Sequence, residues 1–453
     1  MEMRLFGAGL RLRAGLWLAA AGLAFCAIPW ALGQDGLDSL VSAPNPSHAI
    51  KGRVLPDRLP DKPSQLPLFT VPIEPLGFSA PGPIYLGQRN SVVSLDFLNE
   101  NRLLFTFRVP GLMHREAGEE NGGDERQIRA VVLALPEGKV EAEALWTVHD
   151  RARYLWVLKS GRFLLRDREN LELGDATLEL KPFLRFPGPL LWMEMDPSQQ
   201  FLVTNSSEPL AAQKPEDVPS PFTASASTTE DGQKPEGQPE LVVRILRRDS
   251  GQVMLVSRVR SAVHLPINAD GYLESLRGRD SAWVLNLKFF SGGSRILGQV
   301  DSSCSPLFDF LSQTEVLVTA CTHTGANKLV AMSTDGRRLW EAQTSDTAVW
   351  PMVVRAPDGS RMVREALAVT HAVNAYAPLD REDIKGQLVE VLDAADGKVA
   401  LEAAAGPALD GGGNVAISPS GRRVAVLASG AIQVFELPAP PPLPDPVASK
   451  PAR

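Results

Sequence analysis

The chain has 453 residues, of which 44% are hydrophobic, 22% charged and 6% aromatic. An apolar fraction of this size can form a large core, which excludes a disordered chain, a collagen, a small disulfide-rich scaffold and a multi-pass membrane protein. The formal net charge is −7, and no basic stripe occurs that could neutralise nucleic-acid phosphates. We therefore expect a globular protein that does not bind nucleic acid.

The first 33 residues have the features of an export signal. Basic residues precede an apolar stretch from 14 to 32, and the small residues Ala31 and Gly33 form a cleavage pattern before Gln34. The stretch is about as long as a short transmembrane helix, so an uncleaved anchor is the alternative. No later segment is apolar enough to span a bilayer. We expect an exported protein, in a bacterial periplasm or outside the cell.

Two cysteines, Cys304 and Cys321, follow the signal and flank two apolar runs that we predict to form a β-hairpin. If Ser312 and Gln313 form a two-residue turn, the cysteines face each other across the strands. Facing residues lie about 4.5–5.5 Å apart, within reach of a disulfide. We predict a structural disulfide in an oxidising compartment, with two separate buried thiols as the alternative.

A hairpin pattern recurs seven times along the chain. Each copy has an alternating apolar strand, a polar break and a second strand, as in 95–98 followed by 102–107. Several breaks contain Asp-Gly or Pro-Ser-Gly, because Gly accepts a positive φ and Pro fixes its own φ. The seven first strands begin at Leu95, Leu155, Met193, Leu265, Ser305, Val353 and Val415.

A second hairpin, with an acidic-glycine turn, follows several of the first hairpins. Its turns contain Gly138, Gly251, Gly336 and Gly397. Two hairpins make a four-stranded antiparallel unit, and seven such units predict an all-β fold, a seven-bladed β-propeller.

The seventh unit ends one strand short, because 432–437 is followed by a proline-rich tail. The apolar segment 68–73 could supply the missing strand and close the ring, which removes exposed sheet edges. We predict a signal peptide at 1–33, a Pro-rich flexible linker at 34–66, the propeller at 67–437 and a Pro-rich tail at 438–453.

Short motifs in these units resemble known propeller repeats. S-P-S-G-R-R-V-A-V at 418–426 resembles WD40-like (PD40 or TolB-type) repeats. D-A-A-D-G-K-V at 393–399 and S-T-D-G-R-R-L-W at 333–340 resemble blades of quinoprotein-like propellers. The resemblance covers about 67–437 in architecture. It implies the fold and says little about activity.

Three long insertions lie between predicted second and third strands, at 109–127, 206–239 and 372–386. We expect 206–239, which is rich in Ser, Thr, Pro and Glu, to be disordered. In a propeller these connections share one face, where they could form a lid or a partner surface. The alternative is that loops lengthen wherever the entropic cost is small.

Links between blades should point at the mouth of the central channel on that same face. Their mixed charge and one tryptophan could bind a polar ligand, and solvated loop residues are the alternative. A metal shared by His149 and His264 would need a convergence that the sequence does not show, so we predict no metal and no cofactor. The candidate binding face is His149, Asp150, Arg151, Arg153, His264, Asp301, Asp346, Trp350 and Asp410.

No Gly-x-Ser-x-Gly elbow, His-Glu-x-x-His motif, phosphate loop or Cys-x-x-Cys-His haem site occurs. We therefore expect a binding or protein-interaction module of the bacterial envelope without catalytic residues, whose partner is another envelope protein or a polar ligand. The alternatives are a propeller enzyme, quinone-dependent or polysaccharide-active, with its site at the channel mouth, and a purely structural protein. A deep polar pocket with shifted pKa values would favour the enzyme, and an apolar rim the scaffold.

Overall fold

The structure is a computed structural model. The predicted export signal, most of the predicted linker, most of each of the three insertions and the end of the tail lie outside the residues that it describes. Within the described part of the chain, no helix is both long and apolar enough to cross a membrane. The described residues are 53–55, 58–80, 92–110, 125–149, 153–209, 240–261, 263–278, 281–323, 327–344, 348–371, 381–409, 412–428 and 430–441.

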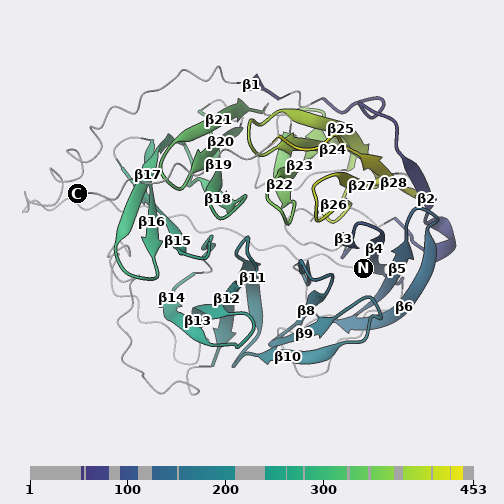
Figure 1. Cartoon of the computed structure of the whole chain (residues 1–453), viewed down its shortest axis with the longest axis horizontal. Helices are drawn as coiled ribbons and strands as arrows, with labels where there is room; N and C mark the ends of the chain where they lie inside the picture. Colours follow the sequence, from purple (N-terminus) through teal and green to yellow (C-terminus); the bar gives the residue numbers. More distant parts are fainter. Residues whose placement is uncertain are drawn as a thin grey trace, which may run out of the picture. The chain divides into compact units, whose positions relative to one another are not determined.

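The strands form seven antiparallel sheets arranged in a ring, which confirms the predicted seven-bladed β-propeller (Figure 1). In each blade the consecutive strands run from the centre of the ring to its edge, and blades five and seven each have one further edge strand from the beginning of the chain. The first three blades contain β3 (Ser94–Asn99), β4 (Arg102–Arg108), β5 (Arg126–Ala134) and β6 (Lys139–Val148); β7 (Leu155–Val157), β8 (Phe163–Asp167), β9 (Asn170–Gly174) and β10 (Lys181–Arg185); and β11 (Leu190–Met195), β12 (Phe201–Glu208), β13 (Glu240–Arg247) and β14 (Val253–Val259).

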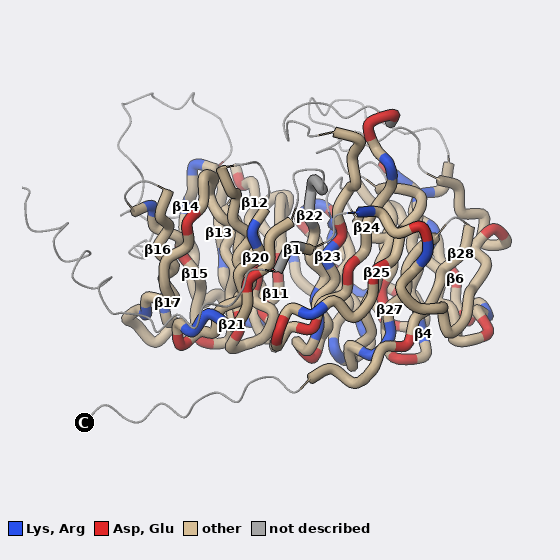
Figure 2. Tube along the Cα trace, turned by 90° about the horizontal axis from the view of Figure 1, so that it is seen from above, with Lys and Arg blue, Asp and Glu red and all other residues tan. Residues whose placement is uncertain are grey.

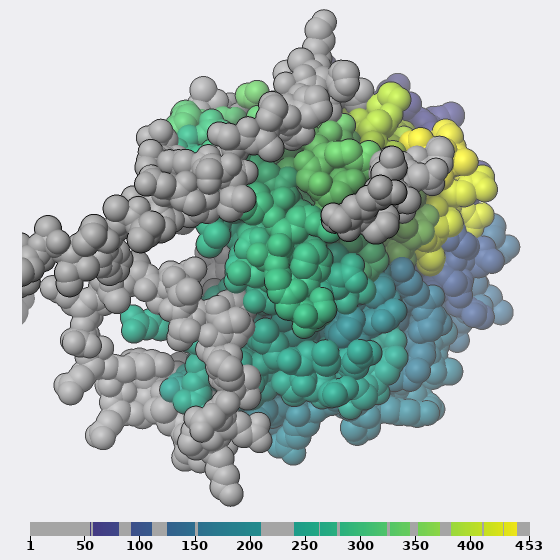
Figure 3. Space-filling view, turned by 60° about the vertical axis from the view of Figure 1, so that its left-hand side comes forward, coloured from purple at the N-terminus to yellow at the C-terminus, as the bar shows by residue number. Residues whose placement is uncertain are grey.

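Blade four has three strands, and its innermost strand is reduced to a single bridge between Ile267 and Tyr272. Blades that follow one another in sequence also follow one another across the surface (Figure 3). The last four blades contain β15 (Gly271–Arg277), β16 (Ala282–Phe289) and β17 (Ser294–Asp301); β18 (Leu307–Phe310), β19 (Glu315–Cys321), β20 (Asn327–Ser333) and β21 (Arg338–Gln343); β22 (Ala348–Arg355), β23 (Arg361–Val369), β24 (Ile384–Asp393) and β25 (Val399–Ala405); and β26 (Val415–Ile417), β27 (Arg423–Ala428) and β28 (Ala431–Glu436).

The ring closes as predicted, because a strand from the beginning of the chain completes blade seven. β2 (Phe69–Pro72) pairs antiparallel with β28, and Phe69 lies opposite Val434. A short strand before it, β1 (Arg53–Val54), pairs parallel with β21 at the edge of blade five. Between them the Ser64 amide donates to the Glu402 carbonyl of blade six. The segment from β1 to β2 therefore protects the outer edges of three successive blades.

Both faces of each blade are covered, because every blade packs between two neighbours. In β4 the consecutive residues Leu103, Leu104 and Phe105 are all fully buried. Leu103 and Phe105 pack towards blade seven, and Leu104 packs towards blade two. Because both faces are buried, the middle strands contain runs of consecutive apolar residues.

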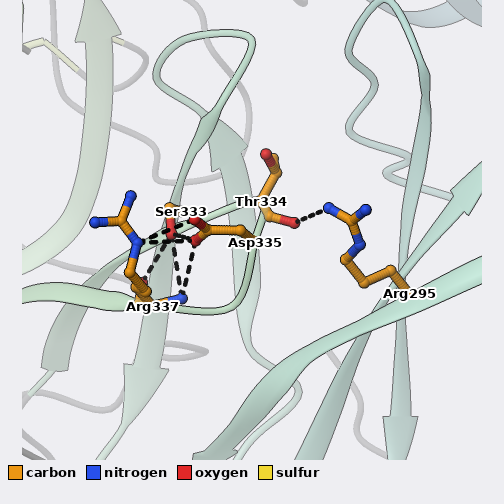
Figure 4. A network of polar contacts seen from close by, with 5 residues as sticks. All are labelled: Arg295, Ser333, Thr334, Asp335 and Arg337. Atoms are coloured by element: carbon orange, nitrogen blue, oxygen red, sulfur yellow. Dashed lines mark hydrogen bonds and ion pairs between the residues drawn. The ribbon is translucent and has the colours of Figure 1, made fainter. Parts of the chain in front are cut away.

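The acidic-glycine turns also hold neighbouring blades together, as blade five shows (Figure 4). Arg337 donates its backbone N–H to the Ser333 hydroxyl and its Nε to the Asp335 carboxylate, both within the turn. Arg295 of blade four donates to the Thr334 carbonyl at 3.3 Å. Gly336 has a φ of +93°, and a Cβ there would lie 2.9 Å from the Leu297 carbonyl oxygen. Glycine is therefore required by both the backbone angle and the close approach of blade four.

Cys304 and Cys321 form the predicted disulfide, with their Cα atoms 5.5 Å apart. The predicted two-residue turn is wrong. Phe310 pairs with Val316, so four residues separate β18 from β19 and the register differs by one from the expectation. Cys304 precedes β18 and is not in its ladder, and this freedom lets it reach Cys321 despite the changed register.

The three insertions connect the second strand to the third in blades one, three and six, as predicted. They join β4 to β5, β12 to β13, and β23 to β24. The last one ends in a short 3₁₀ helix, η3 (Arg381–Asp383), and another, η1 (Glu74–Leu76), follows β2.

Candidate functional site

A cavity of about 400 Å³ lies at the centre of the ring, and residues from all seven blades line it. The first strands of the blades lie nearest this centre (Figure 1). The volume is that of a pocket for a small organic molecule. We call this space the channel cavity.

Three acidic residues on the inner strands line the channel cavity: Asp96 of blade one, Glu194 of blade three and Asp309 of blade five. Each stands between two apolar residues. Because side chains alternate along a strand, the apolar neighbours are buried while the middle residue faces the cavity. The buried neighbours are Leu95 and Phe97, Met193 and Met195, and Phe308 and Phe310.

Glu194 and Asp309 meet His264, which precedes the bridge of blade four. One potential ligand atom from each of the three side chains lies within 4.8 Å of the others. His264 Nε2 is 3.0 Å from Glu194 Oε2, and the Trp192 ring packs edge-on against the imidazole at 5.1 Å between centroids. Burial raises the pKa of Asp309 to about 7, and the nearby Glu194 charge adds to this rise while His264 and Arg355 oppose it. Burial opposes the charged form of His264, but Glu194 and Asp309 together raise its pKa above the usual value.

Blade two, the neighbour of blade three, contributes an aromatic and basic part of the lining. The guanidinium of Arg153 lies 5.3 Å from the centroid of the Trp156 ring, and that of Arg166 lies 5.9 Å from it. Both distances are those of cation–π contacts. Burial raises the pKa of the neighbouring Asp96 to about 6, although the Arg153 charge lowers it. Blade two therefore supplies guanidinium groups to the cavity, and blades one, three and five supply carboxylates.

Arg355 of blade six links the inner strands across the ring. Its guanidinium donates to the Phe310 carbonyl at 2.6 Å and to the Met195 carbonyl at 2.5 Å. These carbonyls end β18 and β11, the strands that carry Asp309 and Glu194. Arg355 thereby fixes the positions of the two acids relative to each other.

A second space of about 230 Å³, the side cavity, shares Asp96, Arg153 and Asp309 with the channel cavity. It also contacts Glu365 of β23, whose side chain is fully buried. Gln387 donates to Glu365 Oε2 at 3.1 Å, and Oε1 has no hydrogen-bond partner. Burial raises the pKa of Glu365 to about 8, so this carboxyl is neutral at pH 7.

Two residues of the predicted binding face, Arg153 and His264, line the channel cavity. His149 lies elsewhere, paired through Nδ1 with Asp167 at 3.0 Å, so the two histidines have separate carboxylate partners. Asp301 is exposed at the end of β17, where the Ser281 hydroxyl donates to it. Trp350 belongs to β22, but its side chain is not described. Asp150, Arg151, Asp346 and Asp410 lie outside the described residues.

The sequence reasoning missed the inner-strand residues Asp96, Trp156, Glu194, Asp309 and Arg355. A signal was present, because each occurs in a predicted first strand among apolar residues. A charged side chain in such a strand has no place between packed blades, and the central channel is the space open to it. Positive and negative side chains are interspersed over the rest of the ring, without a division into one acidic and one basic side (Figure 2).

Comparison with known proteins leaves the family open. No protein-family model matches the chain, and no curated protein matches it. Among solved structures, the acylaminoacyl peptidase of Pyrococcus horikoshii, in an orthorhombic crystal form, aligns with a TM-score of 0.43 and 12% identity over 75% of this chain and 49% of the peptidase. KlHsv2 with loop 6CD replaced by a Gly-Ser linker aligns with a TM-score of 0.34 and 9% identity, over 61% of this chain and 73% of that protein. The chain thus spans about half the length of the peptidase, and similarities this low carry no conclusion about activity.

Proposed function

We propose that the protein is an exported binding module of the bacterial envelope that holds a small polar molecule in the channel cavity. The supporting observation is the convergence of acidic, basic and aromatic side chains from different blades on one space of ligand size. Burial raises the pKa values of Asp96 and Asp309, so keeping these carboxylates charged in the cavity costs stability, which favours a role in binding over a role in folding.

The charged and aromatic groups around the cavity suggest the chemistry of the ligand. Trp156 and the guanidinium of Arg153 suit an acidic group, because guanidinium pairs strongly with carboxylates. Asp96 beside them suits a hydrogen-bond donor such as an amine or a hydroxyl. An amino acid or a hydroxy acid carries both groups within a few bonds.

Isothermal titration calorimetry of the protein without its first 33 residues tests this proposal. The probes are glutamate, lactate and, as a neutral comparator, glucose. We expect one of the acids to bind and glucose to give no heat. Arg153→Gln should weaken the acid roughly tenfold or more, since a charge-assisted hydrogen bond is lost.

Arg102→Gln is the matched control, because Arg102 pairs with Glu141 on the exposed surface of blade one. It removes the same charge away from the cavity and should leave the affinity unchanged. Absence of binding by either acid, or an equal effect of both variants, would contradict the proposed site.

An acid–base enzyme is the second candidate, and the raised pKa values of two carboxyls favour it. Glu365, with a pKa of about 8, holds a proton at pH 7, whereas Asp96, with a pKa of about 6, is mostly ionised, and both line the side cavity. Two carboxyls with separated pKa values are suited to general acid and general base roles. Chemical conversion of a bound probe, followed by NMR, would favour the enzyme over the binding module.

A further inference from the structure

We propose that Glu194, His264 and Asp309 form a binding site for a divalent transition-metal ion, with Zn²⁺ as the fitting ion. The inference deepens the proposed function by placing a metal in the same channel cavity, and it rests on that function only for the site's role. It departs from the sequence-based expectation of no metal.

The geometry is the first argument. The three side chains come from three parts of the ring: Glu194 and Asp309 lie on strands of blades three and five, and His264 lies in the link that leads into blade four. Their potential ligand atoms already lie within 4.8 Å of one another. Four-coordinate zinc with bonds of about 2.0–2.2 Å needs ligand atoms about 3.4 Å apart, so a small rotation of the side chains suffices. Among the residues that the structure describes, this is the single group of three such side chains.

The carboxylates have oxygen atoms available to bind a metal ion. Glu194 Oε2 is buried and has no hydrogen bond of proper geometry, although His264 Nε2 lies 3.0 Å away. The interactions with Glu194, His264 and Arg355 that shift the pKa of the Asp309 carboxyl are electrostatic. Buried carboxylate oxygens are normally hydrogen-bonded or bound to a metal.

The pair His149–Asp167 shows what a purely structural arrangement looks like in this protein. Its separation is also 3.0 Å, but Asp167 Oδ1 already accepts the backbone N–H of His149 at 2.8 Å. No third potential ligand atom joins this pair among the described residues. His264 differs from His149 by having a second carboxylate within reach.

The donor set selects the ion. One imidazole nitrogen and two carboxylate oxygens suit Zn²⁺, which is usually four-coordinate and accepts nitrogen and oxygen ligands. Ca²⁺ takes six to eight oxygen ligands, far more than the site offers. Three protein ligands leave the fourth position of zinc open for a water molecule.

The surroundings support this arrangement. Trp192 packs edge-on against His264 and orients the imidazole. Arg355 carries a positive charge, but its guanidinium is held by the Met195 and Phe310 carbonyl oxygens. It therefore fixes the strands that carry the two acids, as outer-shell residues of metal sites do.

Titration calorimetry of the EDTA-treated protein with ZnCl₂, and separately with CaCl₂, tests the site without any organic ligand. We expect a single Zn²⁺ to bind per chain and Ca²⁺ to give no saturable heat. His264→Gln and Glu194→Gln should each weaken Zn²⁺ binding roughly tenfold or more. His149→Gln is the matched control, and its Zn²⁺ affinity should equal that of the wild type.

Circular dichroism of each variant confirms that it is folded. Failure of the wild type to bind one Zn²⁺ overturns the inference, and so does a folded His264→Gln variant that binds Zn²⁺ as the wild type does. The acid titration in EDTA is scored separately. Zn²⁺ binding without acid binding therefore contradicts the proposed function alone, and the converse contradicts the metal site alone.

Discussion

Charged residues inside blade six have oppositely charged cross-strand neighbours, whereas the acids on the channel wall do not. In blade six, Arg364 of β23 lies directly opposite Glu390 of β24, and the two fully buried side chains form an ion pair. On the wall, the cross-strand neighbours of the acids are apolar. Asp96 lies opposite Leu104, Glu194 opposite Val203, and Asp309 opposite Leu317.

This difference separates charges that hold the fold together from charges that are available to a ligand. Within blade six the sheet register itself supplies the opposite charge, and Arg361 pairs in the same way with Asp393 at 2.7 Å. The wall acids meet charged groups of other blades only at the cavity. The raised pKa values of Asp96 and Asp309 show that the protein alone does not fully compensate these two charges.

The largest effect should come from breaking the pair inside blade six. Arg364→Leu leaves Glu390 buried without its counter-charge, and we expect a loss of about 3–5 kcal/mol in the free energy of unfolding. Urea unfolding at pH 7, followed by circular dichroism, measures this loss. The double variant Arg364→Leu with Glu390→Leu is the control and should recover most of it, because no charge then remains buried. A single variant within about 1 kcal/mol of the wild type would show that the pair does not support the fold.

Glu365 tests the boundary between the two regions, because it lies in blade six and also contacts the side cavity. Its pKa is about 8 in the folded protein and about 4.3 in an unfolded chain. Its contribution to stability is therefore full below about pH 4 and is lost progressively as the pH rises to about 8.

Glu365→Gln keeps the shape of the neutral side chain and removes the titration. We expect the variant to match the wild type near pH 4 and to exceed its stability at pH 8.5 by on the order of a few kcal/mol. Urea unfolding across this pH range measures the difference. Glu402→Gln is the comparator, since the pairing of Glu402 is through its backbone, and it should show no such trend. A pH-independent difference for Glu365→Gln would contradict the buried neutral carboxyl.

The sequence predicts the fold well because its signals are local. Turn glycines and strand alternation lie within a few residues of each other, so the seven hairpins follow from neighbouring positions. Closure by 68–73 follows from the strand count, because the seventh unit ends one strand short. The prediction of a two-residue turn at Ser312 and Gln313 is wrong, and a signal against it was present, because two-residue hairpin loops favour pairs such as Asn-Gly or Asp-Gly. The disulfide does not depend on that register.

The site was harder to predict because its residues are far apart in the chain. Glu194, His264 and Asp309 come together only when three blades pack around the axis. Sequence analysis located the inner strands but assigned the site to the links between them, since loops on a rigid scaffold often bind ligands. Blade one shows how the site could have been located. Asp96 lies between Leu95 and Phe97 in an innermost strand, and because both neighbours are buried between blades, its charged side chain must face the channel.

The smallest change in the free energy of unfolding should come from a substitution on the channel wall. Arg364→Leu should lower the stability, whereas this substitution should raise it. Burial raises the pKa of Asp96 to about 6, so ionisation of this carboxyl lowers the stability of the folded protein as the pH rises from about 4 to about 6. Asp96→Asn should therefore be more stable than the wild type by about 1 kcal/mol at pH 8, less than the full shift implies because the cavity admits solvent. The two proteins should be equally stable at pH 4. Thermal unfolding at the two pH values measures this, and a destabilised variant at pH 8 would place Asp96 with the paired charges of blade six instead.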